Sequence, residues 1–209
     1  VEVAPPAEVV RKKERPEVPV RGFRALSVVL GVLILYIYLL VFGIIMVNAL
    51  GVVDISIAIV VAFIFGIMFA PTFSNALLEK IAGVSLGGAS LILDVISIMM
   101  KAYGKTFLAN EYILLLILGV LPYLLAGVVA GAINRDPAYG FIAGFIVWFI
   151  TFILGALFIY WLATFIAEIT KVSPPSLIEV IIAYVQTGYL SAVFLSIFGA
   201  MGGALRKAS

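Results

Sequence analysis

The sequence contains neither histidine nor cysteine. The imidazole and thiolate ligands on which zinc, copper, haem and iron–sulfur sites usually depend are therefore missing. Nucleophilic catalysis that relies on a thiol or on a histidine base is excluded for the same reason. The chain also lacks the P-loop pattern and the H-E-x-x-H pair. We therefore expect a protein that is not an enzyme and that carries no cofactor and no metal.

Charged residues are also scarce, at 11% of the chain, and 13 basic and 11 acidic residues give a net charge of +2. A balance this close to zero gives no indication of nucleic-acid binding. Gln186 is the only glutamine. Low amide content, the absence of cysteine and the abundance of isoleucine and valine favour a thermophilic source.

Apolar sequence is what the chain has in abundance, with 65% hydrophobic residues and a mean hydropathy of +1.28. We predict an all-α, polytopic transmembrane helix bundle of five or six spans over residues 25–207, in the cell membrane. Residues 1–24 form a proline-rich basic tail that we expect to be cytoplasmic. The apolar run after Arg24 is too long for a signal peptide and has no evident cleavage site, so it is expected to anchor the chain.

A helix needs about 20 apolar residues to cross about 30 Å of hydrocarbon. The runs of suitable length are Ala25–Val47, Ile55–Ala70 continued past Pro71, Tyr112–Ile133, Ala138–Ala167 and Ile178–Leu205. Pro122 lies inside the third run, where a bundle tolerates a kink. The fourth run is so long that it must tilt or project beyond the bilayer.

The segment Val84–Met100 leaves the number of spans open. Its polar residues recur at helical spacing and form one stripe: Ser90, Asp94, Ser97, Lys101 and Lys105. Such a helix either lies flat in the membrane interface or crosses the membrane with the stripe facing its neighbours. Both topologies divide the basic residues ten inside to three outside, which places the N-terminus in the cytoplasm either way. The glycine-rich connections at 82–83 and 87–88 favour six spans.

Small residues recur at every fourth position in several of these runs. The helix-packing candidates are Ala58, Ala62, Gly66, Ala70, Gly127, Gly131, Gly140, Gly144, Gly188, Ala192, Ser196, Ala200 and Gly203. In lipid, helices associate through close backbone approach at small residues. The stripes therefore predict tight packing, either within the chain or against the helices of a partner.

The run Leu121-Pro122, the glycine-rich stretch 126–131, and Gly140 with Gly144 resemble a class of small archaeal multi-pass membrane proteins of unknown function. In that class a proline-containing helix leads into a glycine-rich hairpin, and the last helix closes with a Gly-Gly step like Gly202-Gly203. The resemblance covers roughly residues 115–205. It implies an archaeal source and no particular activity.

Two residues are candidates for polar groups inside the membrane. Asp94 is the one carboxylate that could sit deep, and intramembrane ionisable residues are functional candidates by default. Gln186 lies about ten residues into the last run and is the amide that we expect to be best buried. A transporter would need several such groups converging near the midplane. For Asp94, satisfaction by pairing or by an interfacial position competes with contact to a substrate, an ion or another subunit.

Two functions follow from these observations. The first is a non-catalytic accessory or scaffold subunit of a larger membrane complex, such as a respiratory or energy-converting assembly. It rests on the absence of catalytic chemistry, on the small-residue stripes and on a tail that cannot order itself by burying apolar surface. Its partners would be other membrane subunits and lipid, with no nucleic acid. The alternative is a small secondary transporter or channel that uses Asp94 and Gln186.

Overall fold

The computed structural model describes residues 22–49, 54–83 and 109–208, and between the last two ranges only residues 97, 100, 101 and 104. Within these ranges it gives no side-chain description for residues 46, 47, 49, 55, 57, 58, 60–70 and 187. The elements are helices α1 (Ala25–Ala49), α2 (Ile55–Ala82), α4 (Glu111–Gly119), α5 (Leu121–Asn134), α6 (Pro137–Thr170) and α7 (Leu177–Ala208). The predicted all-α membrane bundle is confirmed.

Four stretches of the described chain are long and apolar enough to cross a membrane: Ala25–Ile45, Glu111–Asn134, Pro137–Thr170 and Gly188–Ala208. The second of them combines α4 and α5, which are separated at Val120. Pro122 lies in the first turn of α5, where its missing N–H costs no helical hydrogen bond. The expected kink is therefore a break between two helices that continue in the same span.

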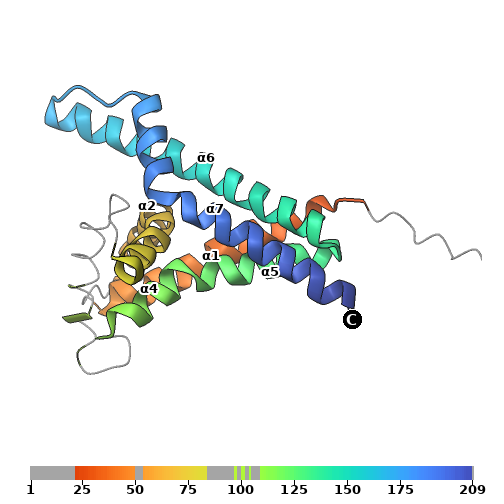
Figure 1. The fold of residues 1–209 in the computed structure, drawn as a ribbon. Coiled ribbons are helices and arrows are strands. Elements are labelled where there is room, and N and C mark those ends of the chain that lie inside the picture. Colours follow the sequence, from red (N-terminus) through yellow and green to blue (C-terminus); the bar gives the residue numbers. More distant parts are fainter. Residues whose placement is uncertain are drawn as a thin grey trace, which may run out of the picture.

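Helix α6 has 34 residues and is about 51 Å long at 1.5 Å per residue. Even at a tilt of about 40°, a path through 30 Å of hydrocarbon takes up only about 39 Å of helix. Helix α6 is therefore longer than the hydrocarbon layer, and the α6–α7 hairpin forms one extremity of the molecule in Figure 1. Lys171 ends α6 in a left-handed conformation with φ of 58°.

The start of α7 has a capping box. The Glu179 carboxylate accepts hydrogen bonds from the Ser176 N–H and hydroxyl at 2.7 and 2.9 Å, and these bonds lower the pKa of Glu179. In return, the Glu179 N–H donates to Ser176 Oγ at 3.2 Å. Such reciprocal bonds satisfy the first N–H groups of a helix and fix where it begins.

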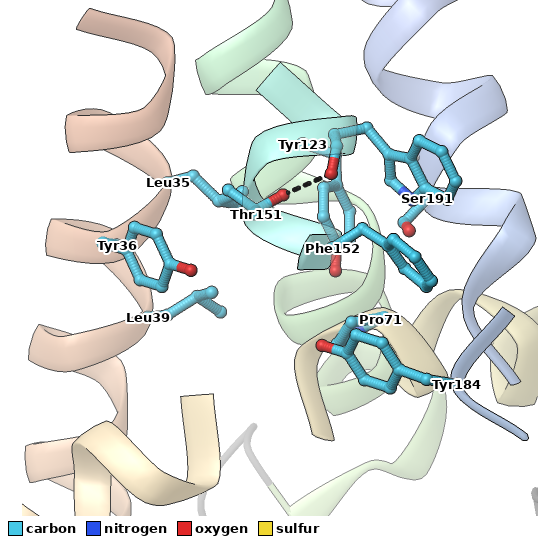
Figure 2. Close-up of a pocket in the computed structure, with 10 residues that line it drawn as sticks. Leu35, Tyr36, Leu39, Pro71, Tyr123, Thr151, Phe152, Tyr184 and Ser191 are labelled. Carbon is cyan, nitrogen blue, oxygen red and sulfur yellow. Dashed lines mark hydrogen bonds between the residues drawn. The ribbon is translucent and has the colours of Figure 1, made fainter. Parts of the chain in front are cut away.

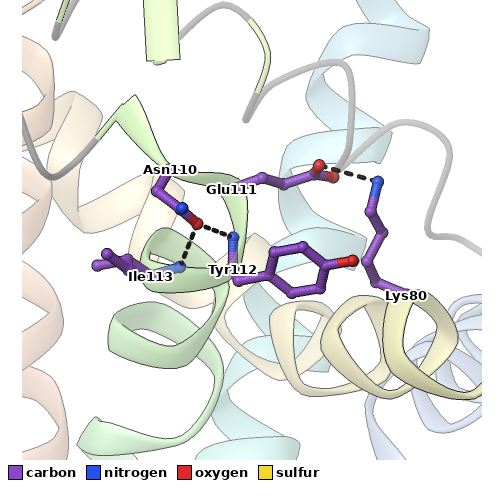
Figure 3. Close-up of polar contacts among 5 residues, drawn as sticks. All are labelled: Lys80, Asn110, Glu111, Tyr112 and Ile113. Atoms are coloured by element: carbon purple, nitrogen blue, oxygen red, sulfur yellow. Dashed lines mark hydrogen bonds and ion pairs between the residues drawn. The ribbon is translucent and has the colours of Figure 1, made fainter. Parts of the chain in front are cut away.

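The first turn of α4 is fastened to the last turns of α2 (Figure 3). Asn110 accepts from the N–H groups of Tyr112 and Ile113 and so caps α4. Glu111 forms an ion pair of 2.8 Å with Lys80, whose ammonium lies 6.0 Å from the centre of the Tyr112 ring. The start of α4 therefore lies beside the end of α2.

The beginning of α1 and the end of α7 lie at the same end of the bundle. The Arg24 N–H donates to Asn134 Oδ1 at 2.9 Å, which places the start of α1 at the α5–α6 turn. At the end of α7, Lys207 lies 3.7 Å from Asp136 in the same turn. If α1 and α7 both cross the membrane, the chain crosses an even number of times. Five spans do not satisfy this condition. Six spans do, but they would place the end of α2 and the start of α4 on opposite faces of the membrane, whereas Lys80 and Glu111 are 2.8 Å apart. The four apolar stretches described above satisfy both conditions.

Helix α2 has 28 residues but is strongly foreshortened in Figure 1, because its axis runs across the axes of α6 and α7. Its neighbours are α1, α4 and α7. The main hydrophobic core lies where α1, α5, α6 and α7 meet. Its buried members are Val28, Leu35, Leu39, Tyr123, Ala126, Ala130, Ala143, Val147 and Leu195.

Candidate functional site

An enclosed cavity of the described structure lies where five helices meet (Figure 2). Helices α1, α2, α5, α6 and α7 each contribute to its wall. The lining residues are Leu35, Tyr36, Leu39, Pro71, Tyr123, Trp148, Thr151, Phe152, Tyr184 and Ser191. Aromatic rings and three phenolic hydroxyls dominate the wall, and none of the lining residues carries a charge.

Residues without bulky side chains bring the helices of this cavity together. A Cβ atom at Gly155 on α6 would lie 2.5 Å from the Tyr184 hydroxyl oxygen. A Cβ atom at Gly188 on α7 would lie 2.6 Å from Pro71 Cβ. Both separations are too short for any larger residue, so the two glycines set how closely α7 approaches α6 and α2. The Tyr184 ring also stacks on Phe152 of α6, with ring centres 5.3 Å apart.

The hydroxyl groups of the cavity differ in their hydrogen bonding. Ser191 donates to the Gly188 carbonyl, and Thr151 donates to the carbonyls of Val147 and Trp148, so both are bonded within their own helices. Tyr123 is only 3% exposed, and its buried hydroxyl makes no hydrogen bond of standard geometry with the residues that the structure describes. The cavity has a volume of about 20 Å³, which is room for about one water molecule. The cavity is therefore suited to a very small neutral molecule and has no group for acid–base chemistry at neutral pH.

A buried amide joins α5 to α1 at the end of the bundle that the start of α1 shares with the end of α7. Asn134 is 1% exposed, and its Nδ2 donates to Ser27 Oγ at 2.8 Å and to the Ala130 carbonyl at 3.0 Å. Its Oδ1 accepts from the Arg24 N–H, which has no acceptor within the first turn of α1. The Ser27 hydroxyl donates in turn to the Arg24 carbonyl. Asn134 thus caps the first helix from a position 110 residues away in sequence.

A second set of buried polar groups lies on α2. Ser74 donates a hydrogen bond to the Gly119 carbonyl at the end of α4. A Cβ atom added at Gly119 would lie 2.7 Å from the Phe73 carbonyl oxygen, so the two helices are in close contact here. Asn75 is 1% exposed and donates from Nδ2 to the Gln186 carbonyl of α7 at 3.2 Å. Asn75 Oδ1 and Glu79 Oε2 are buried and have no hydrogen-bond partner within the part of the chain that the structure describes. These atoms are unusual because most buried polar groups are hydrogen-bonded.

Five of the glycines predicted for helix packing, at positions 127, 131, 140, 144 and 203, lie in one continuous seam between α5, α6 and α7. A Cβ atom at Gly131 would come within 1.8 Å of the Gly199 carbonyl oxygen, and one at Gly140 within 2.2 Å of the same atom. At Gly144 the obstacle is the Leu195 carbonyl oxygen at 2.0 Å, and at Gly203 it is the Asp136 carbonyl oxygen at 2.3 Å. Gly127 approaches the backbone of the same stretch of α7. In this seam the stripes serve packing within the chain.

The α7 stripe named from the sequence is not the line along which α7 makes contact. Gly188 and Ser196 are buried, whereas Ala192 and Ala200 are only half-buried. Steps of four residues advance 40° beyond a full turn, so a strict four-residue stripe winds around the helix. Contact follows a mixture of three- and four-residue steps, through the buried positions Tyr184, Gly188, Ser191, Leu195, Gly199 and Gly202.

Gln186 requires a correction, because the sequence analysis expected it to be the best-buried amide and the structure places it exposed. It lies two residues from both Tyr184 and Gly188, about 200° around the helix from the face that packs on the bundle. Only its backbone carbonyl takes part in a contact between helices. Ser90 and Asp94 lie outside the described residues, as do the side chains of Ala58, Ala62, Gly66 and Ala70.

The sequence analysis missed the residues that make the buried polar contacts: Ser27, Asn75, Tyr123 and Asn134. A signal was available, because Asn75 and Asn134 are amides at the ends of apolar runs and Glu79 follows Asn75 by four residues. The position of a residue within an apolar run does not by itself show whether its side chain is buried. The direction in which each side chain faces turned out to matter more.

Comparison of the chain with protein-family models, with curated proteins and with solved structures finds no match. The functional argument therefore rests on the geometry of the described residues.

Proposed function

We propose that the protein is a non-catalytic, integral-membrane accessory or scaffold subunit of a larger membrane complex. The observation that carries the proposal is the glycine seam, in which the backbones of α5 and α6 lie against that of α7. Alternating access requires one part of a transporter to rock against another around a central site. A seam of backbone contacts resists such movement and suits a rigid support for neighbouring subunits.

The chemistry of the described core agrees with a supporting role. The cavity where the five helices meet has no charged residue in its wall and room for about one water molecule. Ser27, Ser74 and Asn134 use their polar atoms to join helices to one another. A respiratory or energy-converting assembly is the kind of complex in which such a subunit would serve.

The experiment that tests the proposal is extraction from native membranes in a mild detergent, followed by mass measurement of the intact particle. We expect a mass well above that of a single chain and fixed ratios of other integral-membrane subunits. A monomer or a pure homo-oligomer under conditions that preserve known membrane complexes would contradict the proposal.

A small transporter or channel is the second candidate. It is favoured by the unpartnered oxygens of Asn75, Glu79 and Tyr123, since buried polar atoms without partners are suited to contact a solute. Gln186, which this alternative used, is exposed. A homo-oligomer that takes up a solute into liposomes would favour this candidate over the first.

We also propose that the shared end of the bundle faces the cytoplasm. Arg24, Arg135, Arg206 and Lys207 lie at this end, the sequence before Arg24 contains five further basic residues, and basic residues are retained on the cytoplasmic side. Protease added outside oriented vesicles should therefore leave tags at both chain ends intact. Cleavage of both tags would reverse the orientation, and cleavage of one alone would contradict the even number of crossings.

A further inference from the structure

One face of α2 holds two oxygen atoms that no donor among the described residues satisfies. Asn75 Oδ1 and Glu79 Oε2 are both buried without a hydrogen-bond partner. The two residues are four apart in the same helix, so their side chains lie on the same face one turn apart. Leaving a buried acceptor unpaired costs about 1–3 kcal/mol, and more for a charged group. The pair therefore calls for a positively charged partner or a donor.

This face of α2 is directed at α7. Pro71, one turn before Asn75, lies against Gly188 of α7, and Asn75 itself donates to the Gln186 carbonyl. That bond also fixes which way the amide points. Turning it over would place Oδ1 against the Gln186 carbonyl oxygen, so Oδ1 must remain an acceptor directed elsewhere. Glu79 continues the same row of side chains by one further turn.

The basic residue nearest in sequence is already engaged. Lys80 forms its ion pair with Glu111 of α4 at 2.8 Å and lies over the Tyr112 ring. In the helix it is 100° around from Glu79, on the side that faces α4. It therefore serves a different helix pair from the one that Asn75 joins.

From these contacts we infer that Asn75 and Glu79 bind a monovalent metal cation, such as sodium, between α2 and α7. Amide and carboxylate oxygens are the ligands that hard cations prefer. One carboxylate and one neutral amide carry a single negative charge, so a monovalent ion makes the site neutral. Neutrality matters where water is scarce, because an uncompensated buried charge is costly. This site requires no partner subunit and goes beyond the supporting role proposed above.

The test is thermal unfolding of the purified protein in detergent at fixed pH, in sodium chloride and in choline chloride of equal ionic strength. A ligand that binds only the folded state stabilises it by mass action. We expect sodium to raise the midpoint by about 3–6 °C at a tenfold excess over its dissociation constant. Binding of radioactive sodium to the same sample should be measurable and saturable.

The decisive variant is Glu79→Gln, because a glutamine amide can donate to Asn75 Oδ1 and so replaces the cation with a hydrogen bond. It should unfold at the same temperature in both salts and should bind no sodium. Glu168→Gln, at an exposed carboxylate near the end of α6, is the matched control and should behave like the wild type. If Glu79→Gln does not fold, Glu79→Asp should fold and bind sodium more weakly. The inference is overturned if sodium and choline give the same midpoint in the wild type, or if Glu79→Gln keeps the full sodium effect.

Discussion

Replacing Gly131 by alanine is expected to destabilise the protein by about 3 kcal/mol, because the new methyl group has no space. Its position would be 1.8 Å from the carbonyl oxygen of Gly199, which is backbone and cannot rotate away. Helix α5 would have to move away from α7 along the seam. Such a loss corresponds to a fall of about 6–12 °C in the unfolding midpoint for a domain of this size, measured in detergent.

Gly22→Ala is the matched control, because nothing lies within 4 Å of the Cβ position there. It should leave the midpoint within about 1–2 °C of the wild type, as surface substitutions usually do. Ala192→Leu and Ala200→Leu provide a graded comparison, since both residues are half-buried beside the seam. They should cost less than Gly131→Ala. If Gly131→Ala were as stable as the control, the backbone contact between α5 and α7 would be absent.

The second large effect is expected for Asn134→Ala, which removes the amide that caps α1 from the end of α5. The Arg24 N–H and the Ser27 hydroxyl both lose a partner, and each such loss costs about 1–3 kcal/mol when the groups remain buried. We expect a total of about 3 kcal/mol. The start of α1 should also exchange its amide hydrogens faster, which hydrogen-exchange mass spectrometry can measure.

Asn110→Ala serves as the control, because the same residue type at the exposed start of α4 caps only its own helix. It should cost about 1 kcal/mol, the usual value for an N-cap. Ser27→Ala combined with Asn134→Ala should cost less than the sum of the two single changes, since both remove the same hydrogen bond. Equal losses for Asn110→Ala and Asn134→Ala would show that the contact between α1 and α5 contributes nothing.

The glycine seam and Asn134 show what kind of information the sequence contains. The glycine spacing at 127–131 and 140–144 predicted close packing, since only small residues allow backbones to meet in lipid. The identity of the partner helix was left open between this chain and another. Asn134 attracted no attention, because its partners Arg24 and Ser27 are more than 100 residues away and no local pattern connects them.

The sequence by itself determined the membrane location, the helical class and most of the apolar runs, because each depends on local properties: the length of an apolar stretch and the need to satisfy backbone groups in lipid. The orientation of α2 across the other helices, the shared end of the bundle and the exposure of Gln186 were decided by the tertiary structure. Helical periodicity fixes which residues share a face, but which face meets which neighbour depends on how all the helices pack at once. Three-dimensional packing alone therefore placed Asn75 against α7 and left Gln186 on the outer face.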